Sequence, residues 1–348
     1  MKTGPNKTGL IAPKGSILGG RLHVKLVERL GPGVPWFDAT LPEGSRASLG
    51  ETGVHWDGHD LNGFDTLFIQ GFRYEDPVIP AADPVADWSL WQAEHVRRQQ
   101  RYSFLYSLLS RLEAGPATLF NTPSAHLDAF SRHHQLELLE KAGVPVARTL
   151  CTNDAEVARD FHHALTEAGG LAVWRTVTGR SAWQIFRDRQ RSHLMGADKP
   201  PVLIAPIVPG PVRRAYVLSG TTVLTLESAP PTDEGLERLE LFQPLAGPLP
   251  TTEAVISGAA LSAAGLGWGS VLYVAGPDGP VVFDIDADPV ITDLPRALSE
   301  YLLDHLAARL SGQVAPAPAA PDVFARESLF LRRMLRIQFD MERSKGGT

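Results

Sequence analysis

The segment NTPSAHLDAFSRHHQLELLEKAGVPVARTLCTND, residues 121–154, combines a helix, a sharp stop and a strand. Its pattern predicts one helix from Ser124 to Ala142, because Gly143 takes the left-handed conformation at a helix end without steric cost and Pro145 prevents the helix from resuming. The residues VPVARTL that follow are typical of a strand. This order indicates a mixed fold in which helices and strands alternate around the segment.

Downstream of this segment, strand patterns dominate. Asn153 and Asp154 offer an N-cap to a helix that runs to Ala168. The strand-like runs that follow are typical of an antiparallel sheet, and they are LAVWRTV, SAWQIFR, PPVLIAPIV, RRAYVLSG and TTVLTLE. A helix from Ala254 to Leu266 and a hairpin built from SVLYVA and VVFDIDADP complete this region.

Upstream of the segment, residues 1–80 read as short strands separated by Gly and Pro turns. The compact apolar run FDTLFIQG, Phe64–Gly71, predicts a buried strand because glycines bound it. Trp88–Glu113 predicts a long helix because no Gly or Pro interrupts it, and ATLFN after it predicts another strand.

The C-terminal residues predict a linker and a final helix. Residues 311–321, SGQVAPAPAAP, are typical of a semi-extended linker, and Asp322 caps the helix after it. An apolar stripe on this helix is expected to pack on the body of the protein or on a second subunit, which would make the protein a homodimer. The stripe consists of Phe330, Met334, Ile337 and Met341.

The composition excludes several classes of protein. The chain has 348 residues, a formal net charge of -6 and 43% hydrophobic residues, which indicates about two globular domains. A mildly acidic chain is not expected to bind nucleic acid or an anionic membrane, and no apolar run reaches the roughly 20 residues that span a bilayer. Cys151 is the single cysteine and is expected to be a buried apolar side chain rather than a nucleophile. Without a disulfide or a signal-peptide core, the protein is expected to be cytoplasmic.

Three common catalytic signatures are missing from the sequence. It has no G-x-x-x-x-G-K-[ST] loop, no G-x-G-x-x-G after a strand and no G-x-S-x-G turn. His55 and His59 have the spacing of metal ligands on a helix, but Gly58 disfavours a helix there. Two histidines without a third ligand are more often solvated groups than a metal site.

Asp284 and Asp286, in VVFDIDADP, are stronger candidates for chemistry. Alternate side chains of a strand share a face, so the two carboxylates lie about 7 Å apart while Phe283 and Ile285 face the core. The carboxylates repel each other unless a cation or basic groups lie between them. Two interpretations follow: the pair holds Mg²⁺ together with phosphate oxygens, or it belongs to an edge strand paired with arginines.

The order of these pieces resembles the ATP-grasp superfamily, in particular the branch that includes glutathione synthetase and the RimK-type glutamate ligases. Residues 121–154 are similar to its Asn-ended strand, helix, Ala-Gly-Val-Pro-Val turn and Thr-containing strand. LAVWRTVTGRSAW is similar to its lysine strand and phosphate loop, and PPVLIAPIVPGPVRRAYVLSGTTV to its adenine-hinge strand and Arg strand. GPDGPVVFDIDADPVITDL stands where the family has its metal-binding Glu-x-Asn strand.

The resemblance implies an α+β fold. Two ATP-grasp lobes, each presenting an antiparallel sheet, are expected to grip ATP between them, and an N-terminal α/β domain is expected to precede them. The implied division is an N-terminal domain over residues 1–122, a small lobe over 123–203, a large lobe over 204–313, and a linker with the final helix over 314–348.

The resemblance also implies a nucleotide site. Two arginines stand near the family's two phosphate-binding lysines, and a loop of small residues is expected to fold over the β- and γ-phosphates with its backbone N–H groups. Beside the adenine, Ala205-Pro206 replaces the family's Gln-Glu pair. The residues expected to bind the nucleotide are Arg132, Arg175, Thr178, Gly179, Arg180, Ser181 and Ile207.

Catalytic and metal-binding positions follow from the same resemblance. Arg214 matches the arginine that steadies the transferred group, where fixed positive charge offsets developing negative charge. Asp284 and Asp286 replace the family's Glu and Asn as Mg²⁺ ligands. The family's upstream metal-binding Asp is replaced by Val271 or Leu272, which weakens Mg²⁺ retention.

The implied activity is that of an ATP-dependent carboxylate–amine ligase. Such an enzyme uses MgATP to activate the carboxylate of an amino acid or peptide as an acyl phosphate, and an amine then forms the amide. Positioning and charge neutralisation supply most of the catalysis. The alternative is a catalytically degenerate ATP-grasp-like protein that acts as a binding or regulatory partner, as Arg in place of Lys and the missing Asp suggest.

Overall fold

The structure, a computed structural model, divides into two compact units. Within the described residues, the first unit runs to Leu127 and also includes the residues from Leu303, and the second is Asp128–Leu302. The predicted four-part division stays a prediction. The expected loop residues Gly179–Ser181 and the expected final helix lie outside the described residues. The described ranges are 7–72, 84–167, 170–178, 182–187, 194–196, 198–228, 236 and 242–314, without the side chains of 84–87.

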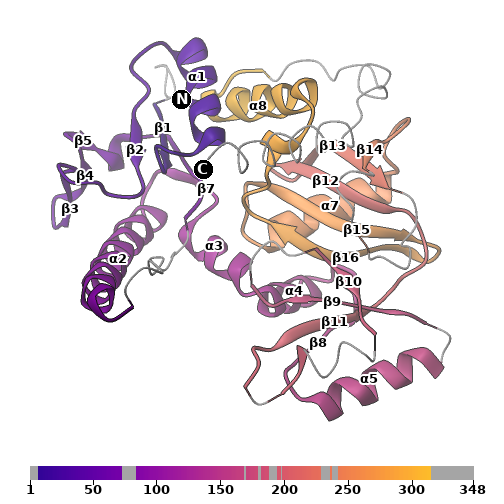
Figure 1. The fold of residues 1–348 in the computed structure, drawn as a ribbon. Coiled ribbons are helices and arrows are strands. Elements are labelled where there is room, and N and C mark those ends of the chain that lie inside the picture. The colour runs from indigo at the N-terminus through magenta and orange to yellow at the C-terminus, as the bar shows by residue number, and fades with distance from the viewer. Residues whose placement is uncertain are drawn as a thin grey trace, which may run out of the picture. The chain divides into compact units, whose positions relative to one another are not determined.

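The first unit is built on a parallel sheet (Figure 1). Every residue of the two central strands is buried, as expected for parallel strands that are covered on both faces. The buried strand that was expected within Phe64–Gly71 is confirmed as one of them. In spatial order the strands are β2 (Trp36–Asp38), β1 (Thr8–Ala12), β6 (Thr66–Ile69) and β7 (Thr118–Phe120).

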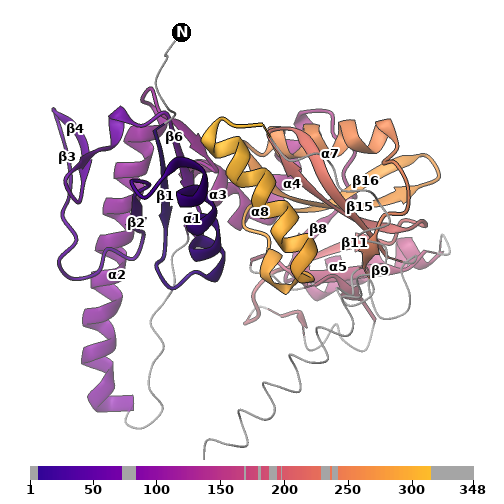
Figure 2. The ribbon, with the colours of Figure 1, turned by 90° about the horizontal axis from the view of Figure 1, so that it is seen from above.

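Two long helices cover opposite faces of this sheet. The chain passes from β1 through α1 (Ile17–Leu30) to β2 on one side, and from β6 through α2 (Pro84–Glu113) to β7 on the other. Right-handed crossovers in opposite directions place the helices on opposite faces. Ile11 and Ile69 accordingly pack in one core with leucines of α2, whereas Leu10, next to Ile11, faces the other way. Figure 2 shows the sheet between the two helices.

The helix α1 corrects the expectation that residues 1–80 form only short strands. Ser16 caps the helix, because its hydroxyl accepts the N–H three residues later at 3.0 Å. Leu18, Leu22 and Leu26 are buried at a spacing of four residues. Two glycines near the start lower the helix propensity, so the packing of these leucines decides the conformation.

A small antiparallel sheet follows β2 in the first unit. It consists of β3 (Ala47–Gly50), β4 (Gly53–Trp56) and β5 (His59–Asp60). The ring of His59 packs edge-on against Phe37, with the ring centroids 5.6 Å apart. This histidine belongs to an aromatic cluster.

The second unit contains a small antiparallel sheet covered by one helix. In spatial order its strands are β10 (Gln184–Ile185), β9 (Ala172–Thr176), β11 (Val202–Pro206) and β8 (Leu150–Thr152). The helix is α5 (Ala155–Glu167), which packs against β8 and β9. Asp154 caps it as expected, since its Oδ1 accepts the N–H of Glu156 at 2.8 Å.

A second antiparallel sheet forms the larger part of this unit (Figure 1). The hairpin expected from SVLYVA and VVFDIDADP is confirmed, and its second strand, Gly279–Asp286, lies at the edge of the sheet. The helix α7 (Thr251–Ala263) packs across the sheet, and α8 (Arg296–Ser311) follows later in the chain. In spatial order the strands are β14 (Gln243–Pro244), β13 (Thr221–Ser228), β12 (Val212–Leu218), β15 (Trp268–Gly276) and β16 (Gly279–Asp286).

The single helix expected from Ser124 to Ala142 is wrong, because the chain forms two helices there. These are α3 (Pro123–Phe130) and α4 (Arg132–Lys141), and Ser131 between them has non-helical angles of φ -92 and ψ 71. The Ser131 side chain forms no capping hydrogen bond, and serine is a weaker helix former than alanine or leucine, so the backbone can leave the helical conformation here. Arg132 therefore becomes the first residue of a helix.

The strand expected over VPVARTL is also shorter than predicted. Only its last residue, Leu150, enters β8, whereas Val146 forms an isolated parallel bridge with Val282 of β16. The N–H of Ala147 donates to the Val282 carbonyl at 2.9 Å, and the Val282 N–H donates to the Pro145 carbonyl at 2.8 Å. Within the described ranges, no helix is long and apolar enough to cross a membrane.

Two helical glycines are expected to respond in opposite ways to replacement by alanine. A Cβ on Gly258 of α7 would lie 2.2 Å from the backbone oxygen of Gly220, whereas a Cβ on Gly20 of α1 would meet its nearest neighbour, Trp36, at 3.8 Å. Gly20→Ala should raise the free energy of unfolding by about 0.5–1 kcal/mol through helix propensity. Gly258→Ala should lower it by about 1–3 kcal/mol, because the backbone must move. Urea denaturation measures both, and a gain in Gly258→Ala would contradict the close packing of α7 on this turn.

Candidate functional site

Three of the residues predicted for the site meet at one carboxylate. Arg132, at the start of α4, forms an ion pair with Oδ1 of Asp284 on the edge strand β16. Arg175, on β9 of the small sheet, binds Oδ2 of the same carboxylate through Nη1 at 2.8 Å. One acidic side chain thus holds two basic side chains from different elements.

The whole cluster is buried. The relative exposures of Arg132, Arg175 and Asp284 are 7%, 2% and 6%. Burial by itself raises the pKa of the Asp284 carboxyl, but the charges of Arg132 and Arg175 outweigh burial, and Arg214 acts in the same direction. The pKa of Asp284 therefore lies below its usual value, and the carboxylate is ionised at neutral pH.

The chain around Arg132 contacts β16 at two points. Arg132 donates through Nη1 to the carbonyl of Ile285 at 2.6 Å, in addition to its ion pair with Asp284. Farther along the chain, Pro145–Ala147 exchanges backbone hydrogen bonds with Val282. The helix start and the turn after α4 are thus both attached to the strand that carries the carboxylate.

The register of the large sheet aligns a row of residues on one face. Arg214 of β12 is opposite Leu272 of β15, which is opposite Asp284 of β16. Directly paired residues of antiparallel strands point to the same face. Ser270 is paired in the same way with Asp286, and Nη1 of Arg214 donates to the Ser270 hydroxyl at 3.1 Å. Arg214, Asp284 and Asp286 therefore share a face, as the sequence predicted for the two aspartates.

Leu272, rather than Val271, occupies the central position of this row. It lies directly between Arg214 and Asp284 and is 1% exposed. The position where the resemblance implies a third metal-binding carboxylate thus holds hydrocarbon on the same face as the charged groups.

A bulge interrupts β16 beside Asp284. The pairing passes from Leu272–Asp284 to Tyr273–Val282, so Phe283 is skipped in the register. The strict alternation expected through Phe283 is therefore broken, because a bulge inserts an extra residue and redirects side chains.

Trp183 was missed by the sequence analysis, although it contacts this site. The guanidinium of Arg175 lies over its ring, 5.5 Å from the centroid, and Phe283 packs edge-on against it at 5.8 Å. Trp183 is 1% exposed. A tryptophan eight positions after an arginine does not by itself indicate such a contact. The contact between Arg175 and Trp183 depends on the tertiary structure.

Thr178 and Ile207 are the other predicted nucleotide-binding residues that the structure describes. Thr178 is exposed after β9, and its carbonyl accepts the Thr176 hydroxyl at 2.6 Å. Ile207 is half-buried after β11, and its N–H donates to the Leu171 carbonyl at 2.8 Å. Their part in nucleotide binding stays a prediction.

The residues present fit a magnesium polyphosphate. Arg132, Arg175 and Arg214 supply the charged donors that phosphate oxygens accept. Asp284 and Asp286 supply carboxylate oxygens, and Mg²⁺ in such sites commonly takes one or two carboxylates together with water and phosphate oxygens. Among the residues that the structure describes, no group of three or more His, Cys, Asp or Glu is arranged to hold a metal ion. A magnesium ion held by these two carboxylates would take its remaining ligands from water or phosphate oxygens.

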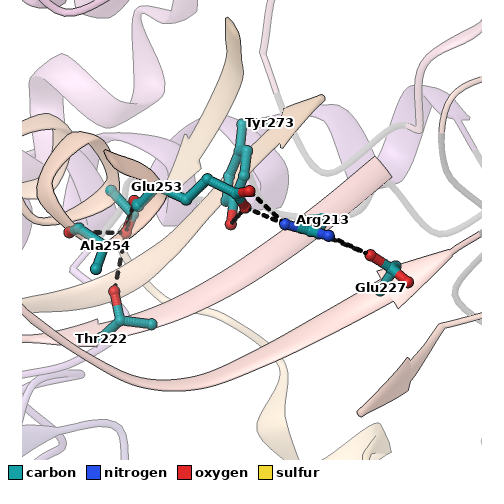
Figure 3. A network of polar contacts seen from close by, with 7 residues as sticks. Arg213, Thr222, Glu227, Glu253, Ala254 and Tyr273 are labelled. Atoms are coloured by element: carbon teal, nitrogen blue, oxygen red, sulfur yellow. Dashed lines mark hydrogen bonds and ion pairs between the residues drawn. The ribbon is translucent and has the colours of Figure 1, made fainter. Parts of the chain in front are cut away.

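A second polar network lies on the opposite face of the large sheet (Figure 3). Arg213, next to Arg214 on β12, forms ion pairs with Glu227 of β13 and Glu253 of α7. The hydroxyl of Tyr273 donates to Oε2 of Glu253 at 2.8 Å. Burial, followed by the hydrogen bond to Glu253, raises the pKa of Tyr273, so the phenol stays protonated and acts as the donor. This network attaches α7 to the sheet.

Removing one hydroxyl from this network is expected to weaken the fold measurably. Tyr273→Phe should lower the free energy of unfolding by about 1.5–3 kcal/mol, the usual value of a hydrogen bond to a charged partner. In a Glu253→Ala background the same change should cost less than half as much, because the acceptor is already gone. Urea denaturation of the four proteins measures the coupling. Equal costs in the two backgrounds would show that Tyr273 contributes through packing alone.

Comparisons with known proteins give one partial sequence match and extensive structural matches. No protein-family model matches the chain. The tetrahydromethanopterin:alpha-L-glutamate ligase of Methanosarcina acetivorans is 39% identical over 87 residues, which are 24% of this chain and 25% of that ligase. The chain is thus matched over only about a quarter of the length of this curated relative.

The structural matches cover nearly the whole of each partner. The ATP-grasp ligase PsnB, in complex with a minimal precursor, is 22% identical with a TM-score of 0.67, covering 89% of this chain and 100% of PsnB. The macrocyclase MdnC of Microcystis aeruginosa MRC, bound with its precursor peptide MdnA, is 15% identical with a TM-score of 0.63, covering 88% and 100%. PsnB with minimal precursor, Mg and ADP has a TM-score of 0.65 at 22% identity, covering 83% and 91%. At these identities the likeness is one of fold.

Proposed function

Because the chain has the ATP-grasp fold, we propose that it is an ATP-dependent carboxylate–amine ligase. The observation that carries this proposal is the convergence of Arg132, Arg175 and Asp284 on one buried point. Residues of the types expected for phosphate and metal binding come from two different sheets and the start of a helix, and they meet there. One carboxylate and two guanidinium groups together carry a net positive charge, which favours the binding of an anion at this point.

The proposed roles follow from the chemistry of each group. Arg132 and Arg175 bind phosphate oxygens through charge-assisted hydrogen bonds. Arg214, on the same sheet face, stabilises the negative charge that develops on the transferred phosphoryl group. Asp284 and Asp286 would hold Mg²⁺, which lowers the negative charge of the phosphates when bound.

The proposed reaction has two steps. A substrate carboxylate oxygen bonds to the γ-phosphorus of ATP, the bond to the bridging oxygen breaks, and ADP leaves. An amine then attacks the carbonyl carbon of the acyl phosphate, inorganic phosphate departs, and the amine loses a proton to give the amide. The protein supplies orientation and fixed positive charge for both steps, so no nucleophilic side chain is required.

The proposed substrate is the carboxylate of a peptide or an amino acid. One structure of PsnB contains the precursor peptide PsnA2, the structure of MdnC contains the precursor peptide MdnA, and the Methanosarcina relative is named a glutamate ligase. These names support the substrate class for this chain by similarity of fold and of one segment. The expected homodimer through the C-terminal helix stays a prediction, since that helix lies outside the described residues.

One observation favours the alternative, a binding protein of the same fold without turnover. Leu272 lies directly opposite Asp284, where the family resemblance implies a further metal-binding carboxylate. A site with fewer carboxylates retains Mg²⁺ less well. Such a protein would act as a binding or regulatory partner without ATP turnover.

Titration with ATP tests the proposed function. In the presence of Mg²⁺, isothermal titration calorimetry should detect ATP binding, and Arg175→Met should weaken it by about 10- to 100-fold through loss of a charge-assisted hydrogen bond. Arg46→Met, a change at the small sheet of the first unit, serves as the control and should leave the affinity unchanged. Absence of binding at millimolar ATP would remove the ligase and leave the binding or regulatory partner. Binding without ADP formation in the presence of candidate peptides would leave the alternative.

Arg175→Lys tests whether this arginine merely replaces a lysine. Lysine retains the charge but lacks the planar group that contacts Asp284 and lies over Trp183. We expect ATP affinity to fall by about 5- to 20-fold relative to the wild type, a loss of about 1–2 kcal/mol. Affinity equal to or above that of the wild type would show that either cation serves at this position.

A further inference from the structure

Asp284 contacts the same two guanidinium groups that the proposed function assigns to phosphate. Arg132 binds one of its oxygens and Arg175 binds the other. A carboxylate that forms ion pairs with two guanidinium groups matches a phosphate group in the sign of its charge and in the cations that it binds. The protein thus carries an anion of its own at the proposed phosphate-binding arginines.

A polyphosphate without a metal competes poorly for this position. All three side chains are less than a tenth exposed, so their charges interact in a medium of low dielectric constant. Phosphate oxygens next to the ionised Asp284 carboxylate repel it, and they compete with it for the positive charge of both arginines. A divalent cation changes the balance, because it takes carboxylate and phosphate oxygens together as ligands.

Asp286 differs from Asp284 in its surroundings. Its Oδ1 accepts the backbone N–H of Asp288 at 3.0 Å, in a local turn at the end of β16. Asp284 instead bridges arginines that are contributed by α4 and β9. The two carboxylates on one sheet face therefore have different partners.

We infer that Asp284 is a specificity-determining residue: it keeps Arg132 and Arg175 from metal-free polyphosphates and releases them when a divalent cation binds to it. The inference rests on the proposed function for the identity of the ligand. One carboxylate then has two states, the counter-ion of the arginines without metal and a metal ligand with it. The site accepts the magnesium complex of a polyphosphate and discriminates against the free anion.

The test compares the wild type with Asp284→Asn, which removes the charge and keeps the shape. Binding of inorganic tripolyphosphate and of ATP is measured by calorimetry in EDTA and in Mg²⁺. In EDTA, Asp284→Asn should bind tripolyphosphate about 10-fold more tightly than the wild type, because the internal anion is gone. The wild type should bind both ligands more tightly in Mg²⁺ than in EDTA, and Asp284→Asn should not. Equal or weaker binding by Asp284→Asn in EDTA would overturn the inference.

Two further variants separate this effect from general effects of charge. Asp286→Asn should lose Mg²⁺-dependent affinity without the gain in EDTA, because Asp286 is not the bridge between the arginines. Glu227→Gln removes a carboxylate that pairs with Arg213 on the opposite sheet face. It should leave the affinity for tripolyphosphate unchanged both in EDTA and in Mg²⁺. A gain in EDTA for either control as large as that for Asp284→Asn would attribute the effect to net charge and overturn the inference.

A charge-balanced variant keeps the test decisive if Asp284→Asn does not fold. Arg132→Met/Asp284→Asn removes one charge of each sign and leaves Arg175 without its internal anion. It should bind metal-free tripolyphosphate more tightly than Arg132→Met alone, and equal affinities would overturn the inference.

Failure of the inference is distinguishable from failure of the proposed function. Tighter metal-free binding by Asp284→Asn without any ATP turnover by the wild type would support the inference and contradict the ligase. Turnover of MgATP by the wild type, together with unchanged metal-free binding in Asp284→Asn, would support the ligase and contradict the inference.

Discussion

The carboxylate of Asp284 connects three segments that are remote in sequence. Arg132 at the start of α4 and Arg175 on β9 both bind this carboxylate, which lies on β16. Arg132 and Asp284 are 152 residues apart in the sequence. A buried ionised carboxylate requires cations, and each buried guanidinium requires an anion. The small sheet and the helix start are therefore attached to the edge of the large sheet by charge at this point, where a protein core usually has hydrocarbon.

The planar guanidinium suits the environment of Arg175 on two sides. Its donors reach Asp284, while the ring of Trp183 lies against the group and Phe283 packs against that ring. An ammonium group offers a point charge without a planar surface to match the ring. Arginine at this position thus has a physical role beyond the arginine-rich composition of the chain, in which 7 of the 33 basic residues are lysine.

Elements with strong local signals were predictable. Asp154 and the helix it caps, the buried strand β6 and the β15–β16 hairpin all follow from caps, glycine boundaries and apolar patterns within a few residues. The helix α1 was missed because its glycines weaken the local pattern, and packing on the sheet outweighs it. The break at Ser131 and the bulge at Phe283 were missed for the same reason, since each depends on partners elsewhere in the chain.

The inventory of the candidate site can be read from the chain without coordinates: arginines at 132, 175 and 214, aspartates at 284 and 286 on one face of a strand, and no acid at 271 or 272. The three-dimensional fold adds three contacts that the chain does not reveal locally: two of the arginines share one carboxylate, Leu272 rather than Val271 is paired with it, and Trp183 lies against Arg175. Periodicity and capping act over a few residues and specify which way a side chain points along its own element. Which side chains meet depends on strand register and on the packing of one sheet against another, and these are settled by contacts between distant parts of the chain.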